Sequence, residues 1–213
     1  SRVGHSIDQQ LLYIADRLFI DDAEVKRSPK QNIGGWVSGG DIKYLDQPDV
    51  NGNYDNVIDS NDRQYTGMPT TPEIVYGFGP SFRYKKFDFS FFFQGAARVS
   101  IMMNGIHPFG DGETRSVLQF IADDYWSEDN QNIYAKYPRL SKRDNPNNTA
   151  WSTYWQRNGA FLKLKNAEIG FNHKFFRIYL RGSNLLTFSP FKYWDPEMGS
   201  GSGLSYPTQR VFN

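Results

Sequence analysis

Cysteine is absent from the 213 residues, which excludes disulfide bonds and thiolate metal sites but leaves the cellular compartment open. Neither sign of charge is in real excess: 24 basic and 23 acidic residues leave a net charge of +1, which points to no nucleic-acid partner. No signal peptide opens the chain, and no apolar run approaches the length of a membrane-spanning helix. Histidine is scarce too, and His5, His107 and His173 lack the spacing of metal ligands.

Aromatic residues, in contrast, are abundant. Phe, Tyr and Trp make up 16% of the chain, and 19 Gly accompany them. The mean hydropathy is nevertheless polar, at −0.63. Aromatic side chains favour strands, so this composition predicts β structure joined by long loops. A transmembrane β-barrel has the same profile, because only every second residue of its strands meets lipid.

Four segments alternate between apolar and polar residues with the two-residue period of a β-strand: Ile74–Tyr84, Phe87–Arg98, Phe161–Asn172 and Phe175–Leu186. The alternation predicts one apolar face, which in a membrane barrel faces lipid. The residues expected on that face include Ile74, Tyr76, Phe78, Phe89, Phe91, Phe93, Ile169, Phe176, Ile178 and Leu180.

The connections between these segments are of two kinds. Tight turns are predicted at Lys85–Lys86 and His173–Lys174, whereas Val99–Arg157 and the residues from Thr187 onward are long excursions. The alternation slips by one residue near Lys165–Asn166, which predicts a β-bulge.

Short helices are predicted inside the long loops. One lies in the segment TRSVLQFIADDYW, with Thr114 as its N-cap, and another starts at Asp22 and stops before Pro29. Neither interrupts a predicted strand, so the fold class is all-β.

Two architectures fit this pattern: a soluble β-sandwich with the aromatic residues in its core, and a membrane barrel with the same residues against lipid. The pattern alone leaves both open. Two details favour the barrel, namely strands of about ten residues and an opposite face that carries Arg83, Asp88, Arg98, Lys163, Arg177 and Arg181. A barrel needs at least about eight strands to close, so in that case the chain is expected to be a fragment.

The stretch NGNYDNVIDSND, residues 51–62, spaces oxygen ligands as an EF-hand calcium loop does. Counted from its first residue, positions 1, 3, 5, 7, 9 and 12 are Asn51, Asn53, Asp55, the backbone carbonyl of Val57, Asp59 and Asp62. No helical pattern flanks the stretch. The sequence therefore predicts either a Ca2+ site or a loop of Asx turns, in which these side chains bond their own backbone.

Several longer motifs follow one another along the chain. They are GDIKYLD (Gly40–Asp46), VIDSNDR (Val57–Arg63), PEIVYGFGPSFRYKKFDFSFFFQGA (Pro72–Ala96), YPRLS (Tyr137–Ser141), FLKLKNAEIGF (Phe161–Phe171), RIYLRGSNLLTFSPFKYWDPE (Arg177–Glu197) and YPTQRVFN (Tyr206–Asn213). In their order and spacing they resemble the C-terminal barrel of the SusC-like, or RagA-like, TonB-dependent transporters. The resemblance covers nearly the whole chain.

The resemblance implies that residues 1–213 form the C-terminal strands and long extracellular loops of a barrel of 22 strands. The plug domain and the rest of the barrel would be absent. It also implies an outer-membrane transporter and not an enzyme. This transporter would import oligosaccharides or peptides and would be energised by TonB, which acts through the absent plug or N-terminal region. Further implied partners are a SusD-like surface lipoprotein over the loops, the remainder of the barrel, and outer-membrane lipid.

Aromatic residues in the long loops predict a contact surface, because exposed Trp and Tyr are typical of sugar-binding and protein interfaces. The candidates for contact with substrate or partner are Trp126, Trp151, Trp155, Tyr193 and Trp194. The alternative role for each ring is packing that stiffens the loops. Two competing functions are a secreted, calcium-binding, carbohydrate-binding β-sandwich and a fragment of a glycoside hydrolase with a carboxylate pair such as Asp195 and Glu197.

Overall fold

The computed structural model describes residues 4–5, 8–105, 117–200, 206 and 208–213. The chain forms two compact units. The first, called the sheet unit, comprises Ser1–Asp8, Met68–Met102 and Arg157–Asn213, and the second, called the loop unit, comprises Gln9–Gly67 and Met103–Gln156. No helix in the described ranges is long and apolar enough to cross a membrane.

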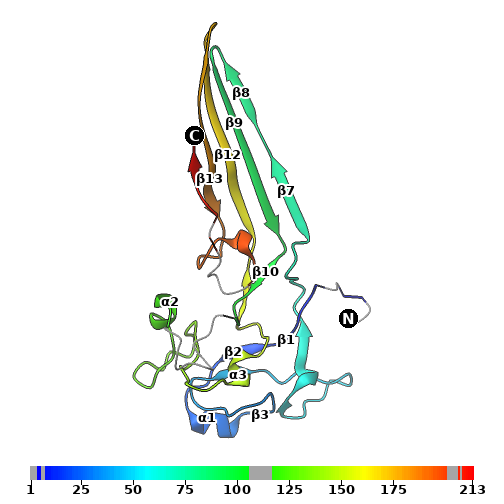
Figure 1. The fold of residues 1–213 in the computed structure, drawn as a ribbon. Coiled ribbons are helices and arrows are strands. Elements are labelled where there is room, and N and C mark those ends of the chain that lie inside the picture. Colours follow the sequence, from blue (N-terminus) through cyan, green and yellow to red (C-terminus); the bar gives the residue numbers. More distant parts are fainter. Residues whose placement is uncertain (1–3, 6–7, 106–116, 201–205, 207) are drawn as a thin grey trace. The chain divides into compact units, whose positions relative to one another are not determined.

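One antiparallel sheet dominates the sheet unit (Figure 1). Its strands lie in the order β14-β13-β12-β9-β7, and β8 also pairs with β9. Their bounds are β7 Ile74–Phe78, β8 Ser81–Tyr84, β9 Phe87–Ala97, β12 Phe161–Asn172, β13 Arg177–Phe188 and β14 Val211–Phe212. The remaining elements here are β10 (Ser100–Met102), which pairs with β11 (Gln156–Asn158), and the 3-10 turn η2 (Pro196–Met198).

Both tight turns lie at one end of the sheet, and the long connections leave from the other end (Figure 1). Tyr84 pairs with Phe87 across the first turn, which leaves Lys85–Lys86 as its two residues. Lys85 has φ of 53°, the left-handed conformation that a two-residue hairpin turn favours. The predicted turn at this position is therefore confirmed.

Two predicted strand boundaries are wrong. The segment predicted as one strand from Ile74 to Tyr84 breaks at Gly79–Pro80 because proline has no N–H to donate; the Pro80 carbonyl instead accepts from the Phe91 amide at 3.0 Å. The second tight turn is longer than predicted. The His173 amide donates to the Phe176 carbonyl at 2.8 Å, so Phe176 lies in the turn. β13 therefore begins at Arg177 and not at the predicted Phe175.

Two local predictions are confirmed. The register of β12 against both β9 and β13 shifts between Leu164 and Asn166, which is the predicted bulge. Helix α1 (Asp22–Arg27) begins where predicted and ends before Pro29; the Asp21 carboxylate caps it by accepting from the Glu24 amide at 2.7 Å. Of the other predicted helix only α2 (Gln119–Ala122) is described, and its proposed cap Thr114 lies outside the described residues.

The loop unit is built from short strand pairs and turns. β1 (Leu11–Tyr13) pairs with β6 (Arg63–Tyr65), β2 (Ala15–Leu18) with β4 (Ile42–Tyr44), and β3 (Lys30–Gln31) with β5 (Val57–Ile58). The helical elements are α1, η1 (Ser60–Asp62), α2 and α3 (Pro146–Thr149). Such short elements make few ladder hydrogen bonds, so side chains must hold this unit together.

The buried carboxylate of Asp41 is the polar centre of the loop unit. Its Oδ1 accepts from Arg139 Nε at 2.7 Å and from Asn148 Nδ2 at 2.8 Å, and its Oδ2 accepts from the Ser38 amide at 2.8 Å and from Asn145 Nδ2 at 3.3 Å. A fully buried charge is tolerated only when it is paired and hydrogen-bonded. The three side-chain donors join segments that lie 98 to 107 residues apart from Asp41 in the sequence.

Gly40, in the GDIKY motif, lies against the ring of Trp126. A Cβ atom at this position would lie 2.2 Å from Cε3 of that ring, and its φ of +79° is one that side chains rarely adopt. Only glycine therefore lets the motif approach the indole and place Asp41 at the centre of the cluster.

Candidate functional site

One face of the sheet is apolar and exposed. The side chains alternate across the strands as predicted, and the rings of Phe78 and Phe93 stack with centroids 5.0 Å apart. Ile178 is 64% exposed and Leu180 61% exposed, fractions that a soluble sheet would remove by covering this face with a second layer. The exposed members of the face include Ile74, Tyr76, Phe78, Phe82, Tyr84, Phe87, Ile169, Ile178 and Leu180.

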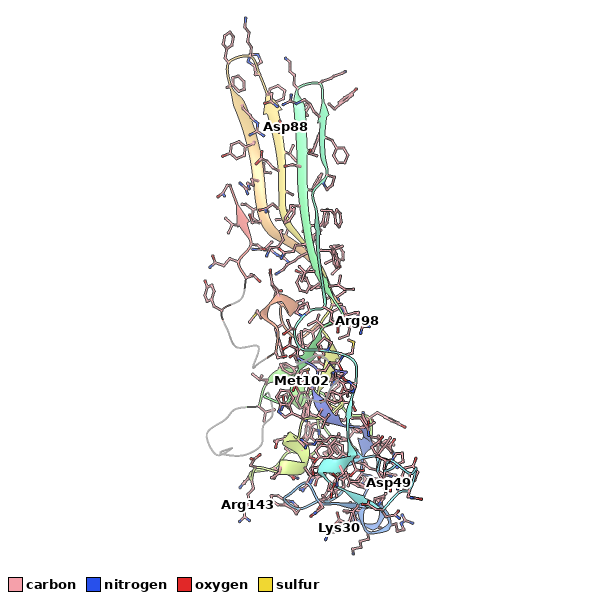
Figure 2. The ribbon with its side chains drawn as sticks, turned by 90° about the vertical axis from the view of Figure 1, so that its right-hand side faces the viewer. Lys30, Asp49, Asp88, Arg98, Met102 and Arg143 are labelled. Atoms are coloured by element: carbon pink, nitrogen blue, oxygen red, sulfur yellow. The ribbon has the colours of Figure 1, made fainter. Side chains whose placement is uncertain are left out.

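The opposite face is charged. Near the tight turns, Arg177 on β13 donates to Asp88 Oδ2 on β9 at 2.7 Å and to Glu168 Oε1 on β12 at 2.6 Å. Asn172 also donates to Asp88. Figure 2 shows Asp88 toward this end of the sheet and Arg98 at the opposite end. Three neighbouring strands therefore present paired charges on the same face.

An exposed apolar face opposite a charged face suits a sheet between hydrocarbon and water. β9 has 11 residues and β12 and β13 have 12 each, which is long enough for a tilted strand to cross a bilayer. The sheet is part of a transmembrane β-barrel. The β-sandwich alternative is not favoured, because it requires the same aromatic side chains to be covered in a core.

At the end of the sheet away from the tight turns, Lys163 forms a buried ion-pair network with the loop that follows β13. Its side chain is 2% exposed, and its Nζ donates to Asp195, to Glu197 Oε2 at 2.7 Å and to Thr208 Oγ1 at 3.2 Å. Lys165 Nζ donates to Glu197 Oε1 at 2.8 Å. The two carboxylates therefore neutralise two lysines.

The network is stable at neutral pH. Burial raises the pKa of Asp195, but hydrogen bonds from Lys163, Thr208 and the Glu197 amide lower it, and the net shift is downward. Burial likewise raises the pKa of Glu197, and hydrogen bonds from Lys163 and Lys165 lower it. The net shift is again downward. Because both folded-state values lie below the unfolded ones, the stabilisation is complete above the ordinary carboxyl range and is lost as the pH falls through the lowered values.

The five aromatic residues predicted to touch substrate or partner fall into two groups. Trp155 has no exposed surface and Trp126 is 6% exposed, so for these two the predicted contact is wrong: their rings pack inside the loop unit. Trp151 is 45% exposed. Tyr193 and Trp194 are partly exposed in the sheet unit. Contact with a ligand or partner through these last three residues stays a prediction.

The carboxylates of the 51–62 loop are bonded to backbone amides. Asp55 Oδ1 accepts from the Val57 amide at 2.8 Å, and Asp59 Oδ1 accepts from the Asn61 amide at 2.8 Å. Asp62 Oδ2 accepts from the Asp59 amide at 2.7 Å, which completes a capping box at η1. This arrangement is the Asx-turn alternative.

Two further predicted ligands, Asn51 and Asn53, are held through their backbone. Their backbone amides both donate to Asp49 Oδ1, at 2.8 and 2.9 Å. Within the described part of the chain, no three histidine or carboxylate side chains are placed to hold a metal ion together. Ca2+ binding by this loop, whose predicted ligands include amide and backbone oxygens, stays a prediction.

One carboxylate beside this loop, that of Asp46, lies outside the EF-hand spacing, which starts at Asn51. Asp46 Oδ2 accepts from the amide of Asn56 at 2.8 Å, and Asn56 has the left-handed φ of 59°. Asp46 Oδ1 is buried without a hydrogen-bond donor. Burial, together with the negative charges of Asp62 and Asp55, raises the pKa of Asp46. These three carboxylates are thus electrostatically coupled.

Comparison with known proteins gives the family. No family model matches the chain. Two curated proteins of Formosa agariphila are similar: TonB-dependent receptor P3, 30% identical over 187 residues, and TonB-dependent receptor P26, 31% identical over 196 residues. The matches cover 77% and 85% of this chain, and 18% of each relative. The chain thus spans about a fifth of the length of these relatives.

Solved structures of RagAB share the fold. The RagAB peptide transporter matches with a TM-score of 0.65 at 18% identity, over 96% of this chain and 22% of its own. The open-open state of the RagAB peptide importer matches with a TM-score of 0.64 at 16% identity, over 96% of this chain and 21% of its own. The chain belongs to the TonB-dependent receptors, which are β-barrels of the outer membrane, and it shares its fold with the RagAB structures.

The lipid-facing assignment predicts unequal losses for two neighbouring substitutions on β9. Phe91, near the middle of the strand, pairs with Ala167 on the apolar face, and Ser90 pairs with Glu168 on the charged face. Phe91→Arg should lower the unfolding free energy of the full-length protein in lipid vesicles by about 2–4 kcal/mol, because it places a cation in hydrocarbon. Ser90→Arg should cost much less. Urea titration measures both, and equal losses would contradict the assignment.

The Lys163 network predicts a local effect in the loop that follows β13. Lys163→Met should lower the opening free energy of residues 189–199 by about 3 kcal/mol, because it leaves Asp195 without its cation and Glu197 with Lys165 alone. Lys165→Met should cost about 1 kcal/mol or less, since that lysine is more exposed and pairs only with Glu197. Hydrogen–deuterium exchange of the full-length protein measures both, and similar protection in the two variants would show that Lys163 does not hold this loop.

Proposed function

We propose that the whole protein imports an oligopeptide or an oligosaccharide across the outer membrane and is energised through TonB. The observation that carries this proposal is the two-faced sheet, with exposed apolar side chains on one face and paired charges on the other. Such a sheet separates lipid from an aqueous lumen. The names of the curated relatives and the descriptions of the RagAB structures support the same class.

A surface lipoprotein of the SusD type is the proposed partner at the long loops. Support comes from exposed aromatic side chains in the loop unit: Tyr134 is 75% exposed, Trp151 45% and Trp36 40%. Amphipathic rings of this kind supply large contact area while few rotatable bonds are ordered. The Arg139 guanidinium lies 5.9 Å from the centroid of the Trp36 ring, which adds a cation next to this aromatic surface.

The transport proposal predicts uptake that depends on TonB. Cells that express the full-length protein and its lipoprotein should accumulate either labelled oligopeptides or labelled oligosaccharides. Loss of TonB should reduce this uptake to the level of cells without the transporter, because import through the barrel then has no energy source. Binding at the cell surface should persist, which separates lost transport from lost recognition. Uptake that is unchanged without TonB would overturn the proposal.

Ca2+ binding by the loop at residues 51–62 is a separate proposal, supported by the unpartnered Oδ1 of Asp46 beside the left-handed turn at Asn56. Calcium titration of the full-length protein by calorimetry tests it. Asp46→Asn should weaken binding about tenfold, whereas Asp49→Asn, a matched change at a carboxylate whose Oδ1 accepts from two backbone amides, should change it little. Absence of calcium-dependent heat would identify a loop of Asx turns.

A further inference from the structure

A cavity of about 290 Å3 lies beside the Lys163 network, within the sheet unit. Phe191 and Trp194 line one part of it, with their rings edge to face and their centroids 4.6 Å apart. Lys192 and Arg210 line it as well. The cavity therefore combines an aromatic wall with cations.

The positive charges of Lys192 and Arg210 are not neutralised within the cavity. Of the other charged groups at this end of the sheet, Lys163 and Lys165 are matched by Asp195 and Glu197 through the hydrogen bonds described above. Neither Lys192 nor Arg210 forms an ion pair or a hydrogen bond with any described residue, and both are exposed. The lining therefore keeps two free cations, which attract an anion.

Asn184 adds an unsatisfied acceptor to the same lining. It lies in β13 with φ of 55°, and its Nδ2 donates to the Gln209 carbonyl at 2.9 Å. Its Oδ1 is buried and has no hydrogen-bond partner among the described residues. A buried acceptor without a donor costs free energy, so a ligand N–H or O–H group at this position would be stabilised.

From these observations we infer that the cavity binds a carboxylate group of the transported oligomer, an inference that rests on the proposed function. A carboxylate matches the fork of the Arg210 guanidinium and the ammonium of Lys192. A donor next to the carboxylate supplies the hydrogen bond that Asn184 Oδ1 lacks, and Trp194 offers a ring for apolar or sugar contact. An acidic oligopeptide and an oligosaccharide of uronic acids carry the same group, so both are possible sources.

Two matched probe pairs distinguish the sources. The first pair is a hexapeptide that contains glutamate and the same hexapeptide with glutamine. The second is a hexamer of galacturonic acid and its methyl ester. Calorimetry with the full-length transporter should show that the acidic member of one pair binds at least about tenfold tighter than its neutral counterpart. This difference in affinity corresponds to one charge-assisted hydrogen bond. The pair that shows this difference names the source of the carboxylate.

Paired substitutions place the effect in the cavity. The double variant Lys192→Gln and Arg210→Gln should weaken binding of the acidic probe about tenfold or more, reduce the dependence of that binding on salt, and leave the neutral probe unchanged. The double variant Lys85→Gln and Lys86→Gln removes the same charge at the tight turn and should alter neither. Because all four side chains are exposed, both variants should fold.

The outcomes separate this inference from the transport proposal. Equal affinity for acidic and neutral probes in both pairs, no binding of either acidic probe, or unchanged acidic binding in the cavity variant would each overturn the carboxylate site. TonB-dependent uptake of neutral oligomers alongside any of those results would leave the transport proposal standing. Loss of acidic binding in the cavity variant, without TonB-dependent uptake of any probe, would support the site and overturn the transport proposal.

Discussion

The register of β12 between β9 and β13 is the constraint on which the sheet depends. Side chains alternate with a period of two, so a slip of one residue would carry every charge to the apolar face. Lys163 and Glu168 are an odd number of residues apart and would face opposite sides of a regular strand. The bulge between Leu164 and Asn166 absorbs one residue and keeps both on the charged face. The ion pairs at both ends of the sheet follow from that extra residue.

The loop unit follows a different principle, because its strands are too short for ladder hydrogen bonds to define it. The Asp41 carboxylate instead collects side-chain donors from remote segments; its Oδ1 accepts two hydrogen bonds and its Oδ2 accepts three. A polar group so buried is destabilising unless all its partners are present, so the cluster favours one arrangement of the loops over others. The indoles of Trp126 and Trp155 complete this interior, whereas the rings of Trp36, Tyr134 and Trp151 stay exposed.

Paired and unpaired charges have different roles at the end of the sheet away from the tight turns. The Lys163 network is internally neutral and holds the loop that carries Phe191 and Trp194 against the sheet. Fixed in this way, the loop presents an aromatic wall at little further cost in conformational entropy when a ligand binds. Lys192 and Arg210 are free of such structural pairing, and their charges stay available to a ligand.

The sequence by itself determined the faces of the strands, the turn at Lys85–Lys86, the bulge and helix α1, because each depends on residues close together in the chain. It placed the strand ends less well, since the interruption at Pro80 depends on the pairing with β9. Only the tertiary structure decided that Asp195 and Glu197 neutralise Lys163, that Asp46 belongs to the acidic loop, and that Trp126 and Trp155 are buried. The physical reason is separation: partners 10 to 107 residues apart leave no local pattern, and burial exists only once the chain has folded.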